Sequence, residues 1–133
     1  MTRLGDLRVG LKQRLATING LRVYATMPAK PDSPSAAVIP RSKSPLSFDE
    51  DALYRFAIWV YVNPVDVTRA QTQLDEYLSD TGANSIEAAI EGDPSLGGIA
   101  MAAHVVGWSE YAQLVEIGDG KLLGGRLDVE VMA

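Results

Sequence analysis

The chain has no cysteine and a single histidine, and these shortages exclude several kinds of site at once. Without cysteine there is no disulfide, no thiolate metal ligand and no cysteine nucleophile, a composition that fits a reducing compartment. The sequence also lacks any run of about 18 apolar residues, and residues 1–10 carry positive charge without the apolar core of a secretion signal. We therefore expect neither membrane insertion nor export.

Positive charge is scarcer than negative charge, and the formal net charge is −5. Nucleic-acid binding needs a concentrated positive surface, so we expect no specific nucleic-acid partner. The charges are unevenly spread, because residues 1–46 hold eight basic and two acidic side chains, whereas residues 47–133 hold four basic and fifteen acidic ones. Either folding mixes these halves, or it leaves a polar subunit that meets copies of itself or a partner by opposite charge.

The rest of the composition is that of an ordinary folded domain. The 133 residues are 47% hydrophobic and 22% charged, close to the globular average, so a chain of this length can bury one core. The sequence has no internal repeat and no linker. Residues 1–133 are therefore expected to form a single domain.

The stretch YRFAIWVYVN, residues 54–63, predicts a strand that is apolar on both faces. Its alternate side chains are Tyr54, Phe56, Ile58, Val60 and Val62 on one face and Arg55, Ala57, Trp59 and Tyr61 on the other. Helices can cover one face. The second face then needs an arm of the same chain or another subunit to cover it.

The spacing of leucines predicts an amphipathic helix over residues 4–18, with Thr2 capping its start and residues 19–20 ending it. A second helix is expected to start at Pro64 with Asn63 as its cap, and a short third helix is expected after Asn84.

Short strands are expected at residues 21–27 and 35–40 before the central strand, and two or three more at residues 99–133. This order predicts an α+β fold with an antiparallel or mixed sheet, and with the N-terminal helix and the central helix pair packed on one face. Residues 28–51 are rich in proline and serine, so we expect a long loop or hairpin arm there.

The sequence offers few groups for catalysis. His104 lies between apolar residues of an expected strand, where a histidine is usually structural, although a small enzyme or ligand-binding domain using His104 is an alternative. The acidic cluster of residues 49–51 lacks the spacing of a calcium loop, and residues 118–125 lack that of a phosphate loop. We therefore predict no enzyme activity, catalytic residue, cofactor or metal site.

Taken together, the order of elements and several phrases resemble the tail terminator (tail completion) proteins of long-tailed, non-contractile bacteriophages. The phrases are LRVGLKQRLATINGLRVYATMP, AAVIP, YRFAIWVYV, AQTQLDEYLSDTG, SIEAAIEGDPSLGG and HVVGWSEYAQLVEIGDGKLLGGRLDVEVMA. The resemblance implies a virion protein, assembled in the host cytoplasm, that forms a homohexameric ring on the tail-tube protein, stops tube growth and joins the head through a connector or neck protein. A neck or head-completion protein of the same virion is the alternative within this class.

Six residues are candidates for contacts between subunits or with the tube. Arg8 and Arg14 belong to the basic N-terminal portion, which would meet the acidic portion of a neighbour. Arg41 and Lys43 lie in the expected arm. Trp59 and Tyr61 lie on the second face of the central strand, which a neighbour or the arm would cover.

Overall fold

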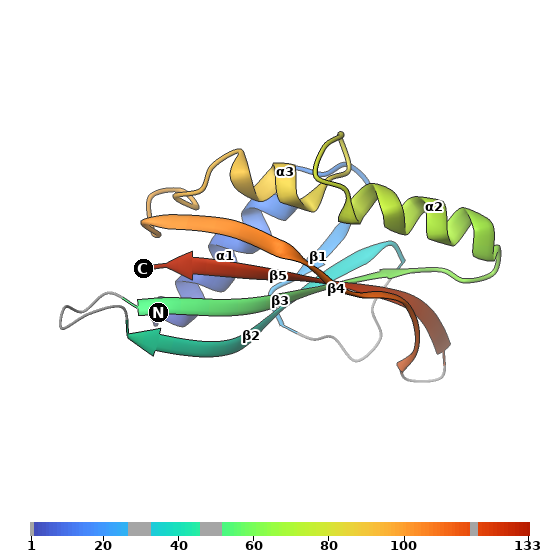
Figure 1. The fold of residues 1–133 in the computed structure, drawn as a ribbon, viewed down its shortest axis with the longest axis horizontal. Coiled ribbons are helices and arrows are strands. Elements are labelled where there is room, and N and C mark those ends of the chain that lie inside the picture. The colour runs from blue at the N-terminus through green and yellow to red at the C-terminus, as the bar shows by residue number, and fades with distance from the viewer. Residues whose placement is uncertain (1, 27–32, 46–51, 118–119) are drawn as a thin grey trace.

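The computed structural model describes residues 2–26, 33–45, 52–117 and 120–133 as three helices and five strands (Figure 1). The elements follow in the order α1 (Arg3–Leu15), β1 (Arg22–Tyr24), β2 (Ser35–Pro45), β3 (Ala52–Val62), α2 (Val67–Leu78), α3 (Ile86–Glu91), β4 (Ala102–Ile117) and β5 (Gly120–Met132).

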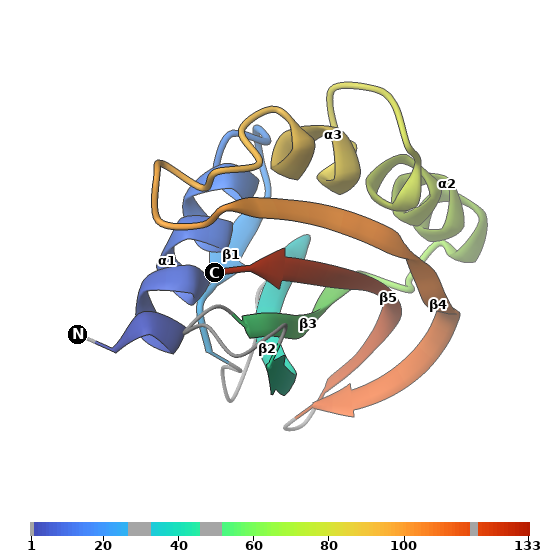
Figure 2. The same cartoon turned by 60° about the vertical axis from the view of Figure 1, so that its left-hand side comes forward.

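The strands form one mixed sheet in the order β1-β2-β3-β5-β4. The β1–β2 pair is parallel and the other pairs are antiparallel. All three helices lie on the same face of this sheet (Figure 2). The predicted α+β fold, with its N-terminal helix and helix pair on one face, is confirmed.

The core lies between the helices and one face of the sheet. The predicted first face of β3 is buried, from Tyr54 at 6% exposure to Val60 and Val62 at 0%. In β5 the alternation of apolar and charged residues puts Leu127 and Val129 beside this row, paired with Ile58 and Phe56. The helices add fully buried leucines, which are Leu7, Leu11 and Leu15 of α1 and Leu74 of α2. Each such side chain contributes about 1.5–3 kcal/mol relative to exposure.

The start of α1 is as predicted, but its end is not. The hydroxyl oxygen of Thr2 accepts a hydrogen bond from the Gly5 amide at 3.0 Å. The helix ends at Leu15 with Ala16 as its C-cap, before the expected residues 19–20. Gly20, at a φ of +82°, lies instead in the turn that leads to β1.

Both later helices begin after a different cap from the one predicted. Asn63 does not cap α2, since its side-chain oxygen accepts from the Val65 amide at 3.0 Å in a tight turn. The cap is Asp66, which accepts from the Arg69 amide at 3.1 Å. For α3 the cap is Ser85 and not its neighbour, and its hydroxyl accepts from the Ala88 amide at 3.0 Å.

The long loop or arm expected over residues 28–51 is not confirmed. Residues 28–32 and 46–51 lie outside the described residues, but Ser35–Pro45 is β2, paired with β3 along its whole length. Pro40 fits in this strand because β1 pairs only as far as Ala37 and the β2–β3 register shifts just after Pro40. Prolines are tolerated at such edges and bulges, since no ladder hydrogen bond is lost there.

Two expected strands between residues 99 and 117 are one continuous strand, β4, which forms a long hairpin with β5. The hairpin extends beyond β3, since β3 ends opposite Leu123 while the β4–β5 pairs continue to Ile117 and Gly120. Register shifts after Val105 and Trp108 interrupt β4. Bulges bend a strand, and β4 and β5 curve together away from the helices (Figure 2).

Candidate subunit interface

The second face of the sheet has a small apolar centre of its own. Ala37, Ala57 and Tyr61 are 0%, 0% and 2% exposed, yet none belongs to the core cluster under the helices. Trp59 is half-buried and stacks on Tyr61, with 6.4 Å between ring centroids and 8° between ring planes. Part of the predicted apolar face is therefore covered within the subunit. The Trp59 indole lies at the border of this covered part and is partly exposed.

The curve of the hairpin contributes to this cover. A methyl group at Gly124 would lie 3.3 Å from Val115 Cγ2 and 3.5 Å from Tyr61 Cδ1, so Gly124 lies between these two side chains. Burial raises the pKa of the Tyr61 phenol to about 12.

Farther along the same face the side chains are charged. Arg55 Nε lies 3.4 Å from Glu130 Oε2, and Arg126 Nε lies 2.9 Å from Asp128 Oδ1. These pairs and Arg41 line an open groove of about 500 Å³. Ion pairs near the surface contribute about 0–1 kcal/mol each to folding stability. These charges therefore add little stability, and their main effect is to make this part of the face charged.

His104 lies at the border of this charged region. Its side chain is 53% exposed, and its Nε2 is 3.7 Å from Glu130 Oε1. Within the described ranges, no hydroxyl donates to or accepts from His104. His104 can thus form a weak ion pair with Glu130 when it is protonated. Among the described residues, no hydroxyl is placed for His104 to activate as a nucleophile.

Of the two candidate arginines of α1, Arg14 bonds inside the subunit and Arg8 is partly buried. Arg14 Nε donates to the Ala89 carbonyl oxygen at 2.8 Å, which ties α1 to α3. Arg8 is half-buried, and its Nε atom has no hydrogen-bond partner in the described part of the chain. A role of either residue between subunits stays a prediction.

The two candidates of β2 are exposed but serve different surfaces. Arg41 lies at the register shift and borders the groove on the second face. Lys43 pairs with Tyr54, and its ammonium lies 5.5 Å from the centroid of that ring. The six predicted residues therefore fall in three places, along α1, at the end of β2 and on the second face.

Most of the exposed large apolar side chains of the described residues lie along β4, which the sequence reasoning did not select. Val105 of this strand is buried, but five large apolar side chains in or next to β4 are each at least 37% exposed, namely Met101, Val106, Trp108, Tyr111 and Leu114. β4 is an edge strand and contains no lysine, arginine or proline, the residues that usually protect an edge from pairing. The signal was present as the run IAMAAHVVGW, which is apolar at both alternating positions.

Beside this edge, two aromatic rings and a carboxylate form an open pocket of about 260 Å³ between α2 and β4. The Tyr111 hydroxyl donates to Asp75 Oδ1 at 2.5 Å. This hydrogen bond, followed by burial and the negative charge, raises the pKa of Tyr111. The Trp108 ring is tilted by 52° against the Tyr111 ring, with 5.8 Å between centroids. We call this site the aromatic pocket; Leu78 and Ser79 complete its lining.

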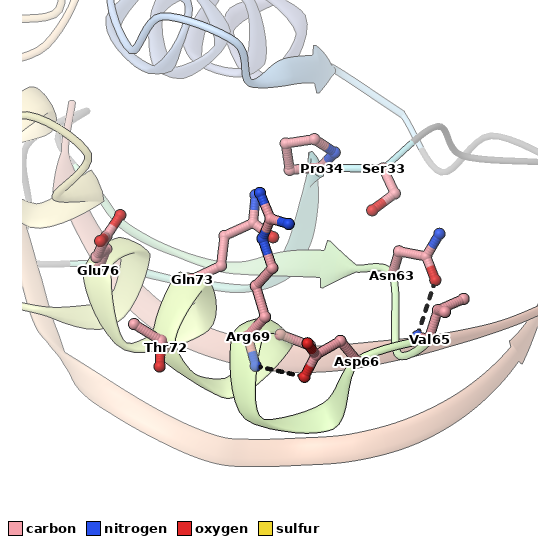
Figure 3. A pocket seen from close by; sticks show the side chains of 10 residues that line it. Ser33, Pro34, Asn63, Val65, Asp66, Arg69, Thr72, Gln73 and Glu76 are labelled. Atoms are coloured by element: carbon pink, nitrogen blue, oxygen red, sulfur yellow. Dashed lines mark hydrogen bonds between the residues drawn. The ribbon is translucent and has the colours of Figure 1, made fainter.

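A larger open cavity, of about 720 Å³, lies at the start of α2 (Figure 3). Arg69 and Gln73 extend from α2 into it, while Asn63 and Asp66 line its other end (Figure 3). The oxygens of Asn63 and Asp66 accept from backbone amides, so these two side chains hold the turn and the helix start. These polar groups at the cavity therefore serve to form the start of a helix.

Three further findings bear on the class of protein. The described residues contain no group of three or more His, Cys, Asp or Glu side chains that could hold a metal ion. None of the helices in the described part of the chain is long and apolar enough to cross a bilayer. No protein-family model matches the chain, and no curated protein matches it significantly.

Proposed function

We propose that this chain is a structural virion protein that forms a ring, caps the phage tail tube, stops tube elongation and provides the surface to which the head attaches. The observation that carries the proposal is the apolar edge of β4, where Val106, Trp108 and Leu114 are each more than half exposed. The bulges of β4 hinder backbone pairing along this edge, so its exposed apolar side chains are the feature that invites association with another protein surface. A subunit that works only within an assembly leaves such a surface uncovered when alone.

The distribution of charge supports association between copies of this chain. The elements α1, β1 and β2 carry seven basic side chains and one acidic one. By contrast, α2, α3 and β4 carry six acidic side chains and one basic one. β1 and β4 are the two edges of the sheet, α1 packs on β1 and β2, and α2 packs on β3, β5 and β4. The asymmetry of the sequence halves is therefore kept between the two edges of the sheet, although α1 also packs on the acidic helix α3.

Opposite charges at opposite edges favour head-to-tail contacts. In such a contact each copy uses two different surfaces, and a suitable rotation between copies closes the assembly into a ring. The proposed partners are further copies of the chain in a homohexamer, the tail-tube protein and a connector or neck protein.

The test is a tube-growth assay with the tail-tube protein encoded in the same genome. Adding the chain to polymerising tube protein should shorten the tubes seen by negative-stain microscopy and place a ring at one end. Bovine serum albumin at equal concentration serves as the control and should leave tube length unchanged. Unchanged tube lengths with no end-bound density would refute the proposal, and binding to purified connectors in place of tubes would indicate a neck protein.

A further inference from the structure

We infer that the aromatic pocket receives an arginine or lysine side chain from the basic α1–β2 surface of a second copy of this chain. The inference rests on the proposed function, because it specifies the contact between neighbours in the ring. It assigns the pocket to the acidic side of the contact and the cation to the other side.

The chemistry of the pocket suits a cation. Trp108 and Tyr111 line the pocket, and Trp108 is 58% exposed. A cation within about 6 Å of such a ring is attracted to its face, most strongly to tryptophan. Asp75 adds a negative charge. Its Oδ1 accepts the hydrogen bond from the Tyr111 hydroxyl, and its Oδ2 accepts no hydrogen bond from another described residue. A guanidinium or ammonium group can therefore contact a ring and the carboxylate together.

The size of the pocket points to a side chain as occupant. At about 260 Å³ it falls below the range of roughly 300–1,000 Å³ in which small-molecule sites lie. Asp75 is the one charged side chain among the residues that line the pocket, so the pocket carries a negative charge and disfavours anions. A small, open, negative pocket lined by aromatic rings fits one long basic side chain.

The complementary cations are available at the opposite side of the molecule. The side chains of Arg3, Lys12 and Arg41 are exposed and make no hydrogen bond or ion pair with another described residue. They belong to α1 and β2, which lie toward the β1 edge of the sheet, whereas the pocket lies at the β4 edge. Two copies placed side by side bring the pocket of one to the cations of the next, and the contact repeats around a ring.

The first test is the strength of self-association, measured by sedimentation velocity over a range of concentration and salt. Trp108→Ala and Asp75→Asn should each weaken association about tenfold, which corresponds to about 1.4 kcal/mol. Asp75→Asn should also reduce the dependence on salt, because it removes one charge of the contact. The control is Val65→Ala, which removes an exposed apolar side chain outside the pocket and should leave association unchanged.

The second test uses the absence of native cysteine to map the contact. Ser79→Cys places a thiol at the pocket, and Lys12→Cys or Arg41→Cys places one among the cations. A double variant with one thiol at each place should form a ladder of disulfide-linked multimers, while each single variant should stay uncrosslinked. Dimers of the Ser79→Cys variant alone would show pocket meeting pocket and would overturn the inference.

The two tests separate this inference from the proposed function. Wild-type rings that cap tubes, together with unaltered association of the Trp108→Ala variant and no multimer ladder, would overturn the inference alone. A wild-type chain that neither associates nor binds tubes would overturn both.

Discussion

Two adjacent glycines of β5 test the division of the sheet into a helix-covered face and an open face. A methyl group at Gly125 would lie 3.0 Å from Leu74 Cδ1 and 3.1 Å from Leu78 Cδ1, under α2. Carbon atoms pack at about 3.5–4.0 Å, so these leucines would have to move by roughly half an ångström. At Gly124, on the other face, the nearest atom would be Val115 Cγ2 at 3.3 Å, on the outer hairpin.

The magnitudes follow from these distances. Overpacking a core costs about 1–3 kcal/mol, and replacing glycine by alanine gives back about 0.4–1 kcal/mol by restricting the unfolded chain. Gly125→Ala should therefore lower the free energy of unfolding by about 1–2 kcal/mol and the Tm by about 3–8 °C. Gly124→Ala should range from no change to about 1 kcal/mol of added stability.

The assay is urea unfolding, followed by far-UV circular dichroism at a concentration low enough to keep each variant monomeric. Self-association would otherwise add to the apparent stability of the folded state. If Gly124→Ala proves the more destabilising change, or if both cost the same, the assignment of the two faces is refuted.

Three further predictions concern single groups. Because burial raises the folded-state pKa of Tyr61 from 10.0 to about 12, its contribution is complete below pH 10 and is lost as the pH rises toward 12. Urea unfolding across that window should show wild type losing about 2 kcal/mol more than Tyr61→Phe, and parallel losses would contradict the role of burial. Because Asp66 caps α2, Asp66→Ala should lower the free energy of unfolding by about 1 kcal/mol, and Asn63→Ala should lower it clearly less. The reverse order would show that Asn63 is the cap, as predicted from the sequence. Arg14→Met should lower stability by about 1 kcal/mol in thermal unfolding, because the hydrogen bond to the Ala89 carbonyl oxygen is lost. An unchanged Tm would show that this bond does not stabilise the subunit.

Hydrophobic periodicity predicted the sheet and the helix faces well. The alternation in residues 54–63 identified the buried row from Tyr54 to Val62, and the leucine spacing identified the buried stripe of α1. Periodicity reports which side chains are buried, and burial dominates the stability of strands and amphipathic helices. These are the features that one sequence carries most strongly.

Helix ends were predicted less well because several residues nearby could act as caps. Asn63 and Asp66 are three residues apart, and both side chains accept from backbone amides. Only the fold decides which one lies at the first helical turn. The same choice arises between Asn84 and Ser85 at the start of α3. Ser85 caps the helix, and the Asn84 side chain donates to Glu76 instead.

The second half of β2, after Pro40, and the apolar edge were missed for a different reason. Ser42, Lys43 and Ser44 look like loop residues, but they pair with β3 because a strand needs no apolar side chain where its faces meet solvent. The exposure of Trp108 depends on β4 being an edge strand and on its register shifts, and both are properties of the sheet rather than of the strand.

The central claim is that the apolar edge of β4 is covered by another protein molecule in the assembly. Its most direct measurement is acrylamide quenching of Trp108 fluorescence in a Trp59→Phe variant, free and bound to tail tubes. We predict strong quenching of the free protein, whose Trp108 is 58% exposed, and a several-fold smaller quenching constant on the tube. Equal quenching in the two states, with binding to tubes verified by microscopy, would contradict the claim.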